Sequence, residues 1–202
     1  MTRIKFCGLT RACEIEAANE LRPEYVGFVF APKSRRYVAP EKAKELKQLL
    51  AGGIQAVGVF ADGRPETVAA LLNSGVIDQA QLHGHEDGDY IRRLRALSHK
   101  PVIQAFRIGN RQDAAAAEES AADYILLDSG AGTGTVFDWN LIGKIKRPYF
   151  LAGGLSAENV EEAIAFLHPY AVDVSSGIER DGKKEKGKMA DFAAAVRKEH
   201  SL

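Results

Sequence analysis

Ile4-Lys5-Phe6-Cys7-Gly8-Leu9-Thr10 is a short stretch of β-type residues that ends on a cysteine and continues into a glycine and a polar turn. We expect a buried strand to end at Cys7, where the chain enters a loop. Ligands bind at this carboxyl end of the strands in parallel α/β sheets. Isolated buried cysteines are usually inert small hydrophobes, so the position of Cys7 makes it a candidate site residue rather than an assigned one. Cys13 falls inside the expected first helix and has no expected role in the chemistry.

The alternation of strand and helix that starts at this stretch continues along the whole chain. The apolar runs lack the polar alternation of half-exposed strands, as is typical of parallel strands covered on both faces. The expected strands span residues 4–7, 25–30, 55–60, 79–82, 101–106, 124–127, 149–152 and 171–174. The expected helices span residues 11–21, 65–73, 89–97, 112–120, 138–145, 157–167 and 189–198, with a further helix that begins at Pro40.

Eight strand and helix pairs in strict order predict an α/β protein of the (β/α)₈ TIM-barrel class. We interpret residues 1–202 as a single barrel domain. A doubly wound open sheet is the alternative, but that fold normally uses fewer strands and places its phosphate loop after the first of them. The loops long enough to build a site follow the second, sixth and eighth strands.

The composition argues against a nucleic-acid-binding, disulfide-rich or membrane-spanning protein. Lys plus Arg and Asp plus Glu both total 27, so the net charge is zero and no long-range field attracts nucleic acid or an anionic membrane. Two cysteines make no disulfide framework, and no spacing resembles a zinc site, which favours a reducing compartment. No apolar run is long enough to span a bilayer. We therefore expect a cytoplasmic protein without a bound metal.

Two turns of small residues follow the last two expected strands. They are Leu151-Ala152-Gly153-Gly154-Leu155-Ser156 and Asp173-Val174-Ser175-Ser176-Gly177-Ile178. Loops at these positions of a barrel commonly bind phosphate through exposed backbone N–H groups. Most Gly-Gly pairs only make tight turns. Because two such turns occur at neighbouring strand ends, we favour a phosphate site.

A basic loop leaves the second expected strand through Lys33, Ser34, Arg35 and Arg36. Charge clusters in loops usually face solvent. At this end of a barrel, however, a guanidinium group can hold a carboxylate through two parallel hydrogen bonds. One arginine is expected to point inward, and the pattern does not indicate which one.

Asp128 ends the sixth expected strand directly after three apolar residues. An Asp at this place often caps the following loop. Together with Cys7, however, it offers an acid and a base at one rim for a small phosphorylated substrate. The loop that follows contains Gly130, Gly132 and Gly134 and can close over a ligand, and Asp138 is a plausible N-cap of the next helix.

Three further features are secondary candidates. His83 ends the fourth expected strand beside His85, but no third ligand at a matching spacing supports a metal, so His83 is interpreted as lining the site. Asp173 is either a structural hydrogen-bond acceptor or a ligand to substrate hydroxyls. The charged, glycine-punctuated run at residues 181–188 is expected to be a solvated loop, and the weaker alternative is that its lysines add positive potential near the phosphate.

These motifs resemble the phosphoribosylanthranilate isomerase family of tryptophan biosynthesis. The resemblance covers nearly the whole chain and is specific as a set. It is carried by KFCGLT (5–10), VGFVFAPKSRRYV (26–38), VGVF (57–60), QLHG (81–84), LLDS (126–129), GTGTVFDW (132–139), LAGGL (151–155) and VDVSSGIE (172–179).

The resemblance implies an Amadori rearrangement of N-(5-phosphoribosyl)anthranilate to an amino-deoxyribulose phosphate, without a cofactor. By similarity, Cys7 would be the general base at C2′, and Asp128 the general acid at the ring oxygen. Arg36 would hold the anthranilate carboxylate. The phosphate would be held by Gly154, Ser176 and Gly177.

Two alternatives are weighed against this interpretation. The related isomerase of histidine biosynthesis resembles a two-fold repeat with aspartates at both catalytic ends, whereas this chain has Cys7 and no half-to-half repeat. A non-catalytic sugar-phosphate-binding barrel would need the phosphate turns but neither Cys7 nor Asp128. The expected partner is a small phosphorylated molecule, and either a monomer or a homodimer fits the sequence.

Overall fold

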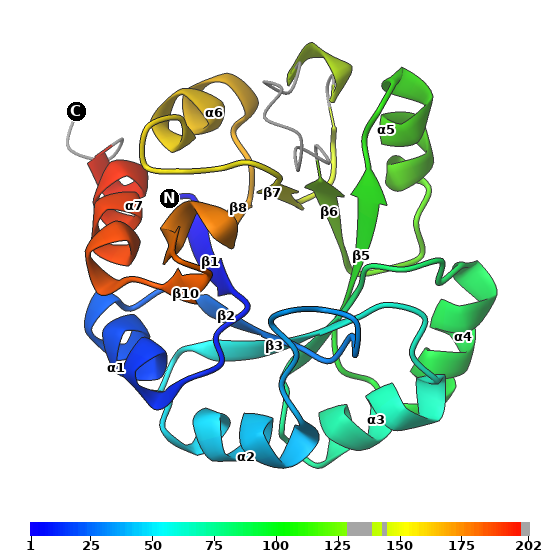
Figure 1. Ribbon diagram of the computed structural model, residues 1–202. Helices are drawn as coiled ribbons and strands as arrows, with labels where there is room; N and C mark the ends of the chain where they lie inside the picture. The colour runs from blue at the N-terminus through cyan, green and yellow to red at the C-terminus, as the bar shows by residue number, and fades with distance from the viewer. Residues whose placement is uncertain (129–138, 143–144, 199–202) are drawn as a thin grey trace.

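The computed structural model describes residues 1–128, 139–142 and 145–198 of the chain. Eight parallel strands close into a barrel in sequence order, with β1 hydrogen-bonded to β8 (Figure 1). They are β1 (Arg3–Cys7), β2 (Tyr25–Val29), β3 (Gln55–Phe60), β4 (Gln79–Leu82), β5 (Val102–Arg107), β6 (Tyr124–Asp128), β7 (Tyr149–Ala152) and β8 (Ala171–Val174). The closed barrel confirms the expected fold, and the open sheet is excluded.

Seven α-helices surround the barrel within the described residues (Figure 1). They are α1 (Ala12–Leu21), α2 (Pro40–Gln48), α3 (Pro65–Asn73), α4 (Gly88–Leu97), α5 (Arg111–Glu118), α6 (Val160–Leu167) and α7 (Lys186–Lys198). Pro40 and Pro65 each stand in the first turn of their helix, where the missing N–H has no intrahelical partner to lose. None of these helices is both long and apolar enough to cross a membrane.

The segments that follow β6 and β7 differ from expectation. Of the helix expected over residues 138–145, the described part contains a 3₁₀ turn, η1 (Trp139–Leu141). Asp138 and the loop with Gly130, Gly132 and Gly134 lie outside the described residues. Helix α6 begins later than expected because Asn159 Oδ1 accepts from the Ser156 N–H at 2.9 Å and holds a turn ahead of the helix.

The prediction of a solvated loop over residues 181–188 is wrong. Strands β9 (Glu179–Arg180) and β10 (Lys183–Lys184) form a hairpin, and α7 begins at Lys186. Asp181 and Gly182 connect the two strands with φ of 52° and 74°, the left-handed geometry that an Asp-Gly hairpin turn requires. The Lys184 side chain is 1% exposed and points inward. The charged run at residues 181–188 therefore contains one buried lysine, Lys184.

Side chains in the barrel interior form layers. Tyr25, Val57, Ile103, Leu126 and Phe150 pack together in the interior as an apolar plug. At the amino end of the strands, the Tyr25 and Tyr170 hydroxyls lie 3.1 Å apart, and the Arg3 guanidinium lies 4.2 Å from the centre of the Tyr170 ring. The plug separates the amino end of the barrel from the carboxyl end, so a ligand that contacts the carboxyl ends of the strands enters from that side.

Candidate active site

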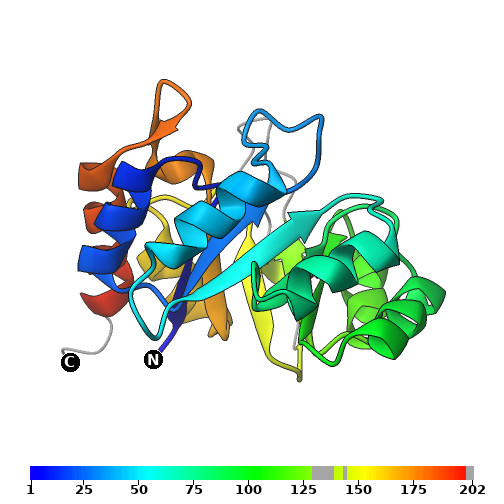
Figure 2. The ribbon, with the colours of Figure 1, turned by 90° about the horizontal axis from the view of Figure 1, so that it is seen from below.

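A cavity of about 750 Å³ opens at the carboxyl end of the strands. In Figure 2 the β9–β10 hairpin and the loop after β2 project from the end of the barrel opposite to the N-terminus. Residues at the carboxyl ends of all eight strands line the cavity. Its predicted site residues are Cys7, Arg36, His83, Asp128, Gly154, Asp173 and Ser176. Gly177 is the one predicted site residue that does not line it.

Cys7 lies in the top layer of the barrel interior and is 8% exposed. The thiol packs against the backbone of β2 at Gly27. A Cβ at that position would lie 2.8 Å from Sγ, so the close contact requires glycine. Val29 and Val59 complete an apolar wall around it. Burial raises the pKa of the Cys7 thiol, the charge of Asp173 raises it further, and Lys5 and Lys184 oppose both effects.

Lys5 and Asp173 form an ion pair in the layer below Cys7. The distance from Lys5 Nζ to Asp173 Oδ1 is 2.9 Å, and the Lys5 side chain is fully buried. The two residues are register partners on β1 and β8, so the barrel itself brings their side chains together. Asp173 therefore has the hydrogen-bonding role that was one of its two expected roles, and it also lines the cavity.

Asp128 on the opposite side of the barrel contacts His83. Asp128 Oδ2 lies 3.3 Å from His83 Nε2, and Gln81 Nε2 lies 2.9 Å from His83 Nδ1. Gln81 and Asp128 thus contact the two ring nitrogens from opposite sides and fix the orientation of the His83 imidazole at the cavity. His85 contacts Asp62 instead of a shared metal site. No three potential ligands converge on a metal position within the described ranges.

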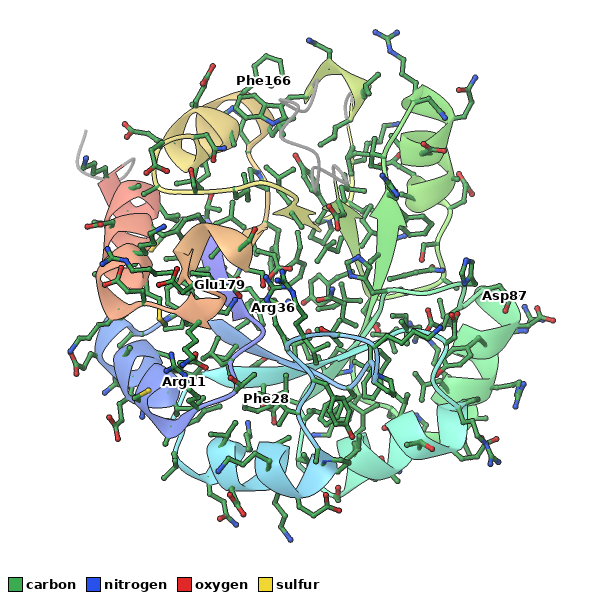
Figure 3. All side chains as sticks on the ribbon, in the orientation of Figure 1. Arg11, Phe28, Arg36, Asp87, Phe166 and Glu179 are labelled. Atoms are coloured by element: carbon green, nitrogen blue, oxygen red, sulfur yellow. The ribbon has the colours of Figure 1, made fainter. Side chains whose placement is uncertain are left out.

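Arg36 is the arginine of the basic loop that turns toward the cavity, while Arg35 and Lys33 are exposed. Glu179 holds it with two hydrogen bonds, from Nε at 2.6 Å and Nη2 at 2.8 Å, and the two side chains lie beside each other in Figure 3. Lys184 Nζ also donates to Glu179, at 2.6 Å. Burial acts to raise the pKa of Glu179, but the hydrogen bonds from Arg36 and Lys184 lower it to about 2.

The two glycine turns meet at the ends of β7 and β8. Gly154 has a φ of 64°, in the left-handed region that favours glycine. A Cβ on Gly177 would lie 2.0 Å from the Leu155 carbonyl oxygen, so only glycine lets the two turns approach this closely. The backbone N–H group of Gly154 donates to no acceptor in the described part of the chain, and Gly154 lines the cavity. An anion in the cavity can therefore use this donor.

Several charged residues at this site were missed by reasoning from the sequence. Arg107 ends β5 and lines the cavity. Lys5 and Lys184 are buried beside Cys7, and Glu179 orients Arg36. For Lys5 a signal was present, because residues two apart on a strand face the same side and Lys5 must share the interior with Cys7. Nothing in the pattern distinguished Lys184 from its exposed neighbours.

Comparisons with known proteins agree with this geometry. Residues 4–195 match the family described as N-(5'phosphoribosyl)anthranilate (PRA) isomerase. N-(5'-phosphoribosyl)anthranilate isomerase of Endomicrobium trichonymphae is 39% identical over 98% of this chain and 99% of its own length. The phosphoribosyl anthranilate isomerase structure from Thermotoga maritima is 35% identical and has a TM-score of 0.89, covering 98% of this chain and 100% of that one.

One solved structure that matches the fold contains a ligand. It is a phosphoribosyl anthranilate isomerase in complex with reduced 1-(o-carboxyphenylamino)-1-deoxyribulose 5-phosphate. It is 35% identical, has a TM-score of 0.87, and covers 98% of this chain and 100% of that one.

Proposed function

The chain belongs to the N-(5'-phosphoribosyl)anthranilate isomerase family, and we propose that Cys7 is the general base and Asp128 the general acid of its reaction. The enzyme is an aldose–ketose isomerase of tryptophan biosynthesis. It converts N-(5-phosphoribosyl)anthranilate to 1-(2-carboxyphenylamino)-1-deoxy-D-ribulose 5-phosphate. The observation that carries the assignment is that a thiol on β1 and a carboxyl group on β6 face one cavity from opposite sides of the barrel.

The order of the proton transfers follows from the chemistry of the substrate. Asp128 gives a proton to the ribose ring oxygen, so that the C1′–O bond breaks as the anthranilate nitrogen forms a C=N bond with C1′. The resulting iminium makes the C2′ hydrogen acidic, and the Cys7 thiolate removes it. The electrons of the C–H bond then form the enol-amine, which tautomerises to the ketose. The proton that Cys7 gained passes back to Asp128 to restore the enzyme.

Arg36 is proposed to bind the anthranilate carboxylate. Glu179 takes the Nε and Nη2 edge of the guanidinium, so the edge that includes Nη1 is left for a second carboxylate. Glu179 also raises the pKa of Arg36 and keeps its charge permanent. The basic loop thus presents one oriented cation at the mouth of the barrel.

The substrate phosphate is proposed to bind at the two glycine turns. Gly154 and Ser176 line the cavity and contribute an N–H group and a hydroxyl, and the N–H group of the neighbouring Gly177 is proposed to join them. Lys184 stabilises the turn after β8, because its Nζ donates to the Ser175 carbonyl oxygen at 2.9 Å. The earlier alternative, in which a lysine of residues 181–188 contributes positive potential near the phosphate, is consistent with this buried position.

Glu179→Gln tests the orientation of Arg36. The amide keeps the size of the side chain but loses one charge-assisted hydrogen bond to Arg36, so we expect KM to rise about tenfold, with a smaller change in kcat. Glu185→Gln is the matched control, because Glu185 lies after the same hairpin and does not contact Arg36. Its carboxylate accepts from the Gly187 and Lys188 N–H groups, at 3.2 and 3.3 Å, and lies 3.7 Å from Arg180. Steady-state kinetics showing equal KM values for the two variants would contradict this role for Glu179.

Gly177→Ala tests the contact between the phosphate turns. The new Cβ would meet the backbone of Leu155 and Ser156, which cannot rotate away as a side chain can. We expect KM for the substrate and the inhibition constant of inorganic phosphate both to rise about tenfold. Gly52→Ala serves as a control, since a Cβ there meets nothing within 4 Å. Unchanged phosphate inhibition in Gly177→Ala would place the phosphate elsewhere.

The decisive test of the function is turnover. The fluorescence of N-(5-phosphoribosyl)anthranilate should decay when the purified protein is added, at a rate proportional to enzyme concentration. Binding of the substrate without its consumption would favour the non-catalytic sugar-phosphate-binding barrel instead.

A further inference from the structure

The Cys7 thiol lies between an apolar wall and a buried group of charges. The wall consists of Gly27, Val29 and Val59. On the other side, β1 and β8 contribute the Lys5–Asp173 ion pair. A thiolate in such a place is destabilised by the loss of water unless a cation compensates it.

Lys5 is placed to supply that compensation. It is two residues before Cys7 on β1, so both side chains point into the barrel, one layer apart. The Lys5 side chain is fully buried, and Asp173 Oδ1 holds its ammonium at 2.9 Å. Burial acts to lower the pKa of Lys5, but Asp173 and Cys7 together raise it above its ordinary value. Lys5 therefore remains a cation beside the thiol.

Within the described residues, three further charges act on Cys7: Asp173 from β8, Lys184 from β10 and Arg36 from the loop after β2. Glu179 on β9 pairs with both Arg36 and Lys184 and so belongs to the same group of charges. With Lys5 there are three cations against two anions, which leaves one positive charge while Cys7 is a thiol. Ionisation of Cys7 makes this group of charges neutral.

We propose that Lys5 is a positioning residue for the reaction, and that its buried ammonium, anchored by Asp173, makes ionisation of Cys7 possible in the dry interior of the barrel. This inference rests on the proposed role of Cys7 as the base. It gives Lys5 no direct contact with the substrate, because the cavity is lined by Cys7 and Asp173 but not by Lys5.

Alkylation of Cys7 tests the proposal without substrate. Cys13 is exposed on α1, so a Cys13→Ser background leaves Cys7 as the single thiol of the 202-residue chain. The rate of reaction with iodoacetamide, measured across pH, reports the fraction of thiolate. Lys5→Met keeps the length of the side chain and removes its charge. We expect its profile to move to higher pH, with alkylation at least about tenfold slower below the midpoint.

A variant of Asp173, the ion-pair partner of Lys5, distinguishes the effect of charge from a loss of packing. Asp173→Asn keeps an acceptor for Lys5 but removes the anion beside the thiol, so its profile should move to lower pH. Lys5→Met combined with Asp173→Asn should return toward the background. Disruption of packing would shift both single variants in the same direction, and that result, or an unchanged profile in Lys5→Met, would overturn the proposal. If Lys5→Met does not fold, Lys5→Gln takes its place, and the same shift to higher pH is expected because it too removes the charge.

The kinetic readout separates this inference from the proposed function. If Cys7 is the base, the pH dependence of kcat/KM in each variant should follow its alkylation profile. Alkylation profiles that shift in opposite directions while kcat/KM does not follow them would support the Lys5 inference and contradict Cys7 as the base. Unshifted alkylation profiles, together with an inactive Cys7→Ser, would contradict the Lys5 inference alone.

Discussion

Replacing Cys7 by Ser is expected to lower kcat/KM by about 10³-fold, within the range that a general base contributes. The hydroxyl has nearly the shape of the thiol, but it does not ionise near neutral pH, so no base remains at C2′. Affinity for the reduced product analogue should change little, because the carboxylate and phosphate contacts of the proposed site are untouched. Turnover is measured by loss of substrate fluorescence, and affinity by calorimetry.

Cys13→Ser is the matched control for this variant, since it makes the same chemical change on the exposed surface of α1. It should keep the activity of the unmodified enzyme. Near-normal turnover in Cys7→Ser would remove the thiol from the mechanism, whatever its position in the barrel.

Replacing Asp128 by Asn is expected to lower kcat by about 10²- to 10⁴-fold, because an amide cannot give a proton to the ring oxygen. The new amide can still hydrogen-bond to His83 Nε2, which lies 3.3 Å from the carboxylate, because an amide group both donates and accepts, so the position of the side chain should be kept. Substrate binding should therefore persist in a slow enzyme. Steady-state kinetics and binding of the product analogue measure the two effects separately.

Asp123→Asn makes the same change just before β6, at the opposite end of that strand. Asp123 accepts from the Val102 N–H at 2.8 Å and pairs with Arg95 at the surface, far from the cavity-lining residues. Its replacement should reduce stability slightly and leave kcat unchanged. Equal losses of kcat in the two variants would mean that Asp128 acts only through the structure of β6.

The fold was predictable because its signals are local and repeated. Strands β3, β4, β7 and β8 have the expected bounds, since each is a short apolar run between polar turns. Cys7 and Asp128 could be placed at the rim of the barrel because each ends a parallel strand, and both line the cavity there. Arg36 could be selected over Arg35 only through the family resemblance, because the loop conformation that turns one of them inward leaves no periodic pattern.

The charges around Cys7 were not predictable in the same way. Lys184 belongs to a run of lysines, and only the hairpin turn at Asp181 and Gly182 directs its side chain to Ser175 and Glu179. Such contacts join residues from the loop after β2, from β9 and from β10, and they depend on how those segments pack. Lys5 is a different case, because the period of a strand already places it in the interior beneath Cys7.

Deuterium at C2′ of the substrate distinguishes the proposed base, Cys7, from the proposed acid, Asp128. In Cys7→Ser, removal of the C2′ hydrogen should limit the rate, so deuteration should lower kcat/KM through a primary isotope effect. In Asp128→Asn, ring opening should limit the rate, and deuteration should have almost no effect. An isotope effect confined to Asp128→Asn, or of equal size in both variants, would contradict the assignment of base and acid.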